Sequence, residues 1–239
     1  MVSQKRIVLV HGWGATVQRL QPLGKALQDL GWSVLVLELP GFDLLPPKEA
    51  WGVENYKNYV LSRARRKFGD KKFFIFGHSF GGRVAIKMAV TDADKLLGTI
   101  LCDTSGISRP SQFKRFIFRM LAKIGKIFLL IPPLANLWRE LLYKSSRSHD
   151  YEKAQGIMKD IFKKVIAEDS RSQLGEIRLP VLILWGREDK MTPVNDAYYL
   201  RNSLPQAKLV VFREEGHRLP YNKPHDLALE IEKWMKTLS

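Results

Sequence analysis

A serine flanked by glycines is the part of this sequence best suited to chemistry. In Gly77-His78-Ser79-Phe80-Gly81, the serine follows a short apolar run at residues 73–76 and precedes a helical pattern. A chain that passes this sharply from strand to helix strains the serine backbone, and the positions two before and two after it then tolerate almost no side chain. The pattern predicts that Ser79 stands on such a turn as an attacking hydroxyl.

A serine hydroxyl attacks well only when a neighbouring imidazole removes its proton, and that imidazole needs a carboxylate to hold its tautomer. His217 follows Gly216 in a predicted loop behind a strand, from which an imidazole can lie over the serine. Two carboxylates compete for the third role: Asp189 follows the apolar run 181–185, and Asp103 directly follows the run 99–102. The residue types therefore predict a Ser-His-Asp arrangement with two candidate acids.

The elements that must position these side chains follow from an alternation of apolar runs with amphipathic helical patterns. This alternation is typical of an α/β fold with a mainly parallel sheet and helices on both of its faces. Predicted strands cover residues 7–10, 34–37, 73–76, 99–102, 181–185 and 208–212, and predicted helices cover residues 20–30, 54–67, 81–89, 196–203 and 225–236.

One stretch, from about residue 108 to residue 170, has helical patterns and no convincing strand. On a helical wheel, Phe116 and Ile124 share an apolar face, and Arg115, Arg119 and Lys123 share the opposite face. We expect a helical lid here, with Phe116 and Ile124 lining the substrate pocket. The predicted organisation is a core in two parts, residues 1–107 and 171–239, interrupted by the lid insertion at residues 108–170.

Composition narrows the class of protein. With 239 residues, of which 45% are hydrophobic, the chain can bury one sizeable core. The single cysteine, Cys102, cannot form an internal disulfide, and no signal-peptide pattern or run of ~20 apolar residues is present, which predicts a cytoplasmic protein. The net charge is +15, from 39 basic and 24 acidic residues, and nine basic residues against one acid lie between Arg109 and Arg147.

That basic segment has two interpretations. Its apolar face can pack over a pocket with the charges in water, or the helix can make weak contact with an anionic membrane surface. Nucleic-acid binding is not expected, because the charge lies on the lid and no binding motif accompanies it.

Five motifs together resemble the α/β-hydrolase fold superfamily over nearly the whole chain. They are His11-Gly12-Trp13-Gly14, Leu39-Pro40-Gly41-Phe42, the Ser79 turn, Leu184-Trp185-Gly186-Arg187-Glu188-Asp189 and Glu215-Gly216-His217. The resemblance implies Ser79, Asp189 and His217 as the catalytic triad, and it favours Asp189 over Asp103. It also implies an oxyanion hole formed by the backbone amides of Trp13 and Phe80. Many relatives continue Pro-Gly-Phe with Gly-x-Ser, whereas this chain has Asp43-Leu44-Leu45-Pro46-Pro47.

The expected activity is that of a serine hydrolase, a carboxylesterase acting on a small or medium apolar ester. No metal and no cofactor are expected, since there is no His-Glu-x-x-His run and the histidines are scattered. The same triad also serves lipases, thioesterases, carbon-carbon bond hydrolases and perhydrolases, and these remain alternatives. A further alternative of another class is a ligand receptor on the same fold with slow turnover.

Overall fold

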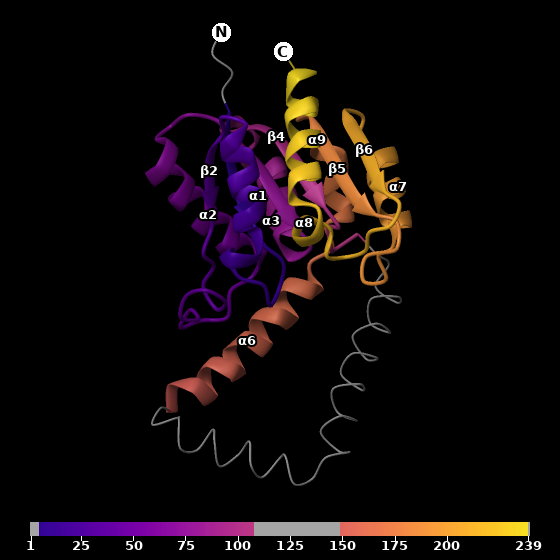
Figure 1. Ribbon diagram of the computed structural model, residues 1–239. Helices are drawn as coiled ribbons and strands as arrows, with labels where there is room; N and C mark the ends of the chain where they lie inside the picture. Colours follow the sequence, from indigo (N-terminus) through magenta and orange to yellow (C-terminus); the bar gives the residue numbers. More distant parts are fainter. Residues whose placement is uncertain (1–4, 108–148, 239) are drawn as a thin grey trace.

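The computed structural model describes residues 5–107 and 149–238, with the backbone alone for residues 149–155. In this part of the chain, six strands form one parallel sheet in the order β2-β1-β3-β4-β5-β6 (Figure 1). Their bounds are β1 Arg6–Val10, β2 Ser33–Val36, β3 Phe73–His78, β4 Leu96–Cys102, β5 Val181–Gly186 and β6 Ala207–Phe212.

Both faces of the sheet are buried. In β1, Ile7 and Leu9 join the hydrophobic cluster on one face, and Val8 and Val10 join the cluster on the other. All four side chains have no exposed surface. Successive side chains of a strand point to opposite faces, so a strand covered on both sides is apolar at every position. This explains why the strands of this chain are continuous apolar runs rather than alternating ones.

The helices supply the two outer layers. α1 and α9 bury their apolar side chains on one face, while α2, α3 and α7 do so on the other (Figure 1). The helix bounds are α1 Val17–Asp29, α2 Val53–Phe68, α3 Phe80–Thr91, α6 His149–Ala167, α7 Val194–Ser203, α8 Leu219–Asn222 and α9 Pro224–Lys236, with short 3-10 helices η1 Ala93–Lys95 and η2 Arg171–Glu176.

α6 extends from the edge of the sheet where the strands end (Figure 1). Its last turns are fixed to the core, because Ile161 and Val165 are buried there. The guanidinium of Arg83, a buried residue of α3, donates to the carbonyl oxygens of Val165 at 3.0 Å and Glu168 at 2.6 Å. The end of α6 is therefore held directly against the helix that begins beside Ser79.

The predicted fold class is confirmed by this parallel sheet with helices around it. Each of the six predicted strands is present, and each of the five predicted helices lies within one or overlaps one of the observed helices. The short α8, η1 and η2 were not predicted. Residues 108–148 lie outside the described residues, so the division at residues 108 and 170 remains a prediction. Within the described ranges, no helix is long and apolar enough to cross a membrane.

Candidate active site

The site is built at the carboxyl ends of β3, β4 and β5. His78 pairs with Cys102, and Cys102 pairs with Leu184, so these three strands end nearly level. The residues that follow them are Ser79, Asp103 and the loop that carries Asp189. The parallel register therefore brings residues far apart in sequence to one edge of the sheet.

Ser79 lies on a strained turn between β3 and α3. Its φ is 51° and its ψ is −110°, a backbone conformation that costs a non-glycine residue free energy. The flanking glycines are required by space: a Cβ on Gly77 would collide with the carbonyl group of Gly81, and a Cβ on Gly81 would collide with the carbonyl of Val10. The turn thus has the geometry that the glycine spacing predicted.

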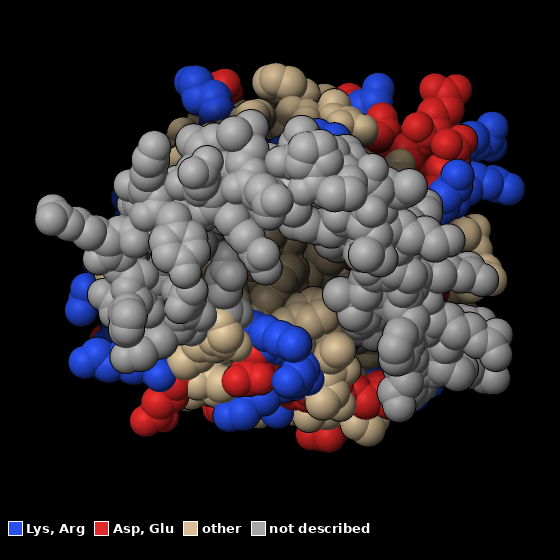
Figure 2. Space-filling model, turned by 90° about the horizontal axis from the view of Figure 1, so that it is seen from below, with Lys and Arg blue, Asp and Glu red and all other residues tan. Residues whose placement is uncertain are grey.

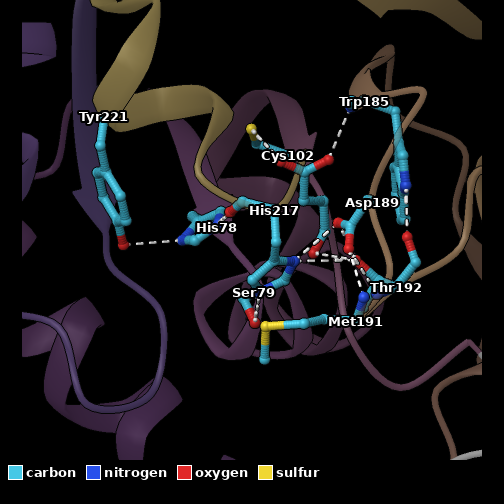
Figure 3. Close-up of polar contacts among 11 residues, drawn as sticks. His78, Ser79, Cys102, Trp185, Asp189, Met191, Thr192, His217 and Tyr221 are labelled. Atoms are coloured by element: carbon cyan, nitrogen blue, oxygen red, sulfur yellow. Dashed lines mark hydrogen bonds and ion pairs between the residues drawn. The ribbon is translucent and has the colours of Figure 1, made fainter. Parts of the chain in front are cut away.

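Ser79, His217 and Asp189 are joined by two hydrogen bonds (Figure 3). Nδ1 of His217 lies 2.7 Å from Oδ2 of Asp189, and Nε2 lies 3.0 Å from Oγ of Ser79. Because a carboxylate can only accept, Nδ1 of His217 carries the hydrogen and Nε2 offers its lone pair to the Ser79 hydroxyl. The imidazole is therefore held in the tautomer that can take the serine proton.

Asp189 is an ionised, fully engaged carboxylate. Its Oδ1 accepts the backbone N–H groups of Met191 at 2.7 Å and Thr192 at 2.9 Å, and its Oδ2 accepts the Thr192 hydroxyl at 2.6 Å. Burial opposes ionisation, but the hydrogen bonds from His217 and Thr192 and the charge of His217 outweigh it, so the pKa of Asp189 lies below its ordinary value. The carboxylate is available to stabilise an imidazolium.

Thr192 is a functional candidate that the sequence reasoning missed. It donates to Asp189 with both its backbone and its side chain. An Asp that accepts backbone N–H groups two and three positions later forms a recurrent turn. The spacing Asp189-Lys190-Met191-Thr192 is a weak signal that could have indicated this role.

Asp103, the competing acid, has a different environment. It is fully buried with φ 42°, and its Oδ1 accepts the backbone N–H of Gly186 at 2.9 Å. Burial, reinforced by the charge of Asp189, raises the pKa of Asp103 well above its ordinary value. A buried carboxyl group whose charged form is disfavoured is a poor partner for an imidazolium, and none of the hydrogen bonds of the described residues joins it to the His217 ring.

The side chains of His78, Asp103 and His217 bring potential metal-ligand atoms within 4.8 Å of one another. Their arrangement does not suit an ion. Both ring nitrogens of His217 are engaged by Asp189 and Ser79, and those of His78 are engaged by the His217 carbonyl and by Tyr221. A metal would have to break these hydrogen bonds.

The loop that carries Trp13, one of the two predicted oxyanion donors, runs directly beside Ser79. A Cβ on Gly12 would lie 3.2 Å from Cβ of Ser79, and Trp13 is the next residue. Phe80 is the first residue of α3, and its N–H is one of the amides at a helix start that have no partner inside the helix. The Trp13 and Phe80 rings are 5.6 Å apart. The structure thus brings both predicted residues to the serine.

The unusual loop after Phe42 supports this region through Asp43. The Asp43 carboxylate accepts the His11 Nε2–H at 2.8 Å and the Val17 N–H at 2.8 Å. It also accepts the backbone N–H of Leu39 at 3.1 Å. Directly after Phe42, this chain therefore has a carboxylate that joins the His11 loop to the start of α1.

Aromatic side chains form one wall beside the serine. The ring of Trp13 lies 4.9 Å from that of Phe42 and 5.0 Å from that of Phe162 on α6. Seen from the end of the molecule where the strands finish, the described surface visible at the centre of the view is uncharged (Figure 2). The predicted pocket residues Phe116 and Ile124 lie outside the described residues, as do the basic side chains of the predicted lid helix.

Comparison with known proteins identifies the family. A family model described as alpha/beta hydrolase fold matches residues 5–224, so the chain belongs to the α/β-hydrolase fold family. It is 25% identical over 232 residues to a pimeloyl-[acyl-carrier protein] methyl ester esterase of Legionella pneumophila (strain Paris), covering 94% of this chain and 92% of the relative.

Two further similarities show the breadth of the family. The chain is 25% identical over 236 residues to a 2-hydroxy-6-oxononadienedioate/2-hydroxy-6-oxononatrienedioate hydrolase of Cupriavidus pinatubonensis (strain JMP 134 / LMG 1197), covering 88% of this chain and 80% of that protein. Among solved structures, a thermophilic esterase from Thermogutta terrifontis superimposes with a TM-score of 0.72 at 23% identity, covering 98% of this chain and 90% of that one. The structural likeness shows the shared fold.

Proposed function

We propose that this protein is a serine hydrolase that cleaves a carboxylic ester through an acyl-enzyme on Ser79. The observation that carries the proposal is the pair of hydrogen bonds, 3.0 Å and 2.7 Å long, that link the Ser79 hydroxyl to His217 and His217 to Asp189. A serine on a strained turn, a base within reach and a buried carboxylate behind it are the parts that nucleophilic acyl transfer needs.

The reaction follows from the positions of these groups. Oγ of Ser79 attacks the ester carbonyl carbon while Nε2 of His217 takes the hydroxyl proton. The carbonyl oxygen becomes negative and is stabilised by the backbone N–H groups of Trp13 and Phe80, each worth ~3 kcal/mol in such sites. The carbon-oxygen bond to the alcohol then breaks, and the alcohol leaves with the proton from His217.

In the second half, His217 removes a proton from water, and the resulting hydroxide attacks the acyl carbon. The bond to Oγ of Ser79 breaks, Oγ regains a proton from His217, and the carboxylic acid leaves. Throughout, the negative charge of Asp189 stabilises the imidazolium form of His217. No step changes an oxidation state, so the reaction needs no redox partner.

The nature of the acyl group is suggested by the wall beside the serine. Trp13, Phe42 and Phe80 lie within 4.9–6.2 Å of one another, ring centroid to ring centroid. Apolar and aromatic walls bind apolar groups, so an ester with a small or medium apolar acyl chain is the preferred substrate class. The methyl ester esterase among the relatives supports an ester, and the dienedioate hydrolase makes cleavage of a carbon-carbon bond the second candidate.

The test is a panel of p-nitrophenyl esters of increasing acyl length, measured with the wild type and with Ser79→Ala. A serine esterase should give repeated turnover on at least the short and medium esters, and the variant should lose it. A ligand receptor on this fold would give at most a single slow turnover. A carbon-carbon bond hydrolase would prefer a vinylogous diketo acid to every ester of the panel.

A further inference from the structure

His78, the residue before Ser79, is engaged on both sides of its ring. Nε2 lies 2.9 Å from the backbone carbonyl oxygen of His217, and Nδ1 lies 3.0 Å from the hydroxyl of Tyr221 (Figure 3). Tyr221 comes from α8, which follows His217 in the chain. The backbone of Gly12, the residue before Trp13, packs directly against this pair: a Cβ on Gly12 would lie 3.0 Å from Nδ1 of His78.

The direction of every hydrogen bond in this set is fixed by one group. The His217 carbonyl can only accept, so Nε2 of His78 carries the hydrogen. In a neutral imidazole Nδ1 is then an acceptor, and the Tyr221 O–H must donate to it. One chain of donors therefore runs from Tyr221 through His78 to the backbone of His217, and Gly12 packs against the His78 ring in the middle of it.

Burial keeps this direction from reversing. His78 is 2% exposed, and burial together with the neighbouring charge of His217 lowers the pKa of His78 to about 3. Burial likewise raises the pKa of Tyr221 to about 12. At neutral pH, His78 stays an uncharged acceptor at Nδ1 and Tyr221 stays a donor. A neutral His78 also matters because its ring centroid is 5.0 Å from that of His217, where a second positive charge would oppose an imidazolium.

We propose that this His78–Tyr221 bridge positions the two halves of the catalytic machinery relative to each other. The His78 ring packs against Gly12 in the loop that carries Trp13, the predicted oxyanion donor, and its Nε2–H holds the backbone of the catalytic histidine. The proposal rests on the proposed serine hydrolase function. It makes His78 and Tyr221 positioning residues, which touch neither the substrate nor the reacting atoms.

The test is Tyr221→Phe, which removes one oxygen and keeps the ring that packs against His78 at 5.1 Å. The matched control is Tyr198→Phe, on the exposed tyrosine of α7. We expect Tyr221→Phe to lower kcat about tenfold per titrated active site with KM nearly unchanged, because only transition-state interactions lose alignment. The control should match the wild type. A role confined to stability would lower the melting temperature and leave kcat per active site unchanged.

A second measurement does not depend on turnover. In protein labelled with ¹⁵N-histidine, His78 should show one pyrrole-type nitrogen, Nε2, and one hydrogen-bonded pyridine-type nitrogen, Nδ1, at neutral pH. Tyr221→Phe should move the Nδ1 resonance toward that of an unbonded pyridine-type nitrogen. An unchanged Nδ1 resonance, or kcat within about twofold of the wild type, overturns the bridge.

The two proposals fail in different ways. If the wild type turns over no ester and its Ser79 takes no acyl group, the proposed function fails, and with it the catalytic consequence of the bridge, whereas the ¹⁵N spectrum still decides whether the bridge exists. If the wild type is an active esterase and Tyr221→Phe equals it in either measurement, only the bridge fails.

Discussion

Nδ1 of His217 lies 2.7 Å from Oδ2 of Asp189. The carboxyl group of Asp103 is also near the His217 ring, but none of the hydrogen bonds of the described residues joins the two side chains. The two acids that the sequence offered therefore differ in environment. Asp189 is surrounded by donors, which favour its charge. Asp103 is surrounded by low-dielectric protein, which favours its neutral form.

This difference predicts a ranking of two isosteric variants. Asp189→Asn should lower kcat on the order of 10³- to 10⁴-fold, because an amide neither holds the His217 tautomer nor stabilises the imidazolium. Asp103→Asn should lower it less than about tenfold, since its Oδ1 can still accept the Gly186 N–H. The assay is kcat on the best ester of the panel. The reverse order would move the catalytic acid to the end of β4.

Loss of the Thr192 hydroxyl should lower kcat less than loss of the Asp189 charge. Thr192→Val keeps the shape but removes the hydroxyl that donates to Asp189 at 2.6 Å, a charge-assisted bond of ~1.5–3 kcal/mol, so kcat should fall about tenfold or more. Thr192→Ser restores the donor and should recover most of the activity. If valine and serine behave alike, the hydroxyl has no role in holding Asp189.

Alanine in place of a glycine of the serine turn should destabilise the fold far more than alanine in place of an exposed glycine. Gly81→Ala places a Cβ against the carbonyl groups of Val10 and His11 and should lower the free energy of unfolding by ~2–3 kcal/mol. Gly175→Ala, in η2, meets no atom within 4 Å and should change it by less than ~0.5 kcal/mol. Urea unfolding followed by circular dichroism measures both. Equal effects would mean that the turn is not as tight as described.

We expect the titration of His78 to cause part of the fall in the free energy of unfolding at acid pH. Its pKa is about 3 in the folded protein and ~6.5 when unfolded, so the unfolded state binds more protons as the pH falls below ~6.5, and the free energy of unfolding falls with it. One such group contributes at most ~1.4 kcal/mol per pH unit. Asp103, whose pKa is raised, contributes in the opposite direction, because its folded form binds a proton that the unfolded form releases above pH ~3.9.

The measurement therefore compares the acid-induced loss of stability in the wild type with that in a variant without His78. Urea unfolding at pH 7 and pH 5 should show a smaller acid-induced loss in His78→Gln than in the wild type. The other titratable groups around His78 are present in both proteins, so their own contributions are subtracted; they are His217, Asp189, His11, Asp103 and Tyr221. Identical losses would show that His78 has the same pKa in the folded and unfolded states.

Much of this arrangement was predictable from local sequence patterns. Continuous apolar runs predicted buried parallel strands, and the glycine spacing around Ser79 predicted the turn, because both depend on neighbours in the chain. The choice of His217 and Asp189 rested on motif order, and the structure brings them within hydrogen-bond distance of each other and of Ser79.

The unpredicted parts depend on contacts between distant segments. The Asp43 carboxylate reaches His11 and Val17, and Tyr221 reaches His78 across 143 positions of sequence. No periodicity or spacing carries such information. For this reason the sequence analysis left Tyr221 unmentioned. The predicted role of Phe116 and Ile124 depends on residues beyond those described and remains a prediction.

The most direct test of the central claim is to trap the covalent intermediate. Wild-type protein is mixed with a p-nitrophenyl ester, quenched in acid during the initial burst and digested, and the peptides are examined by mass spectrometry. The account predicts that the peptide containing Ser79 gains the mass of the acyl group, that fragmentation places it on Ser79, and that Ser79→Ala gains nothing. Turnover by the wild type with the acyl group on another residue, or unchanged turnover by Ser79→Ala, would contradict it.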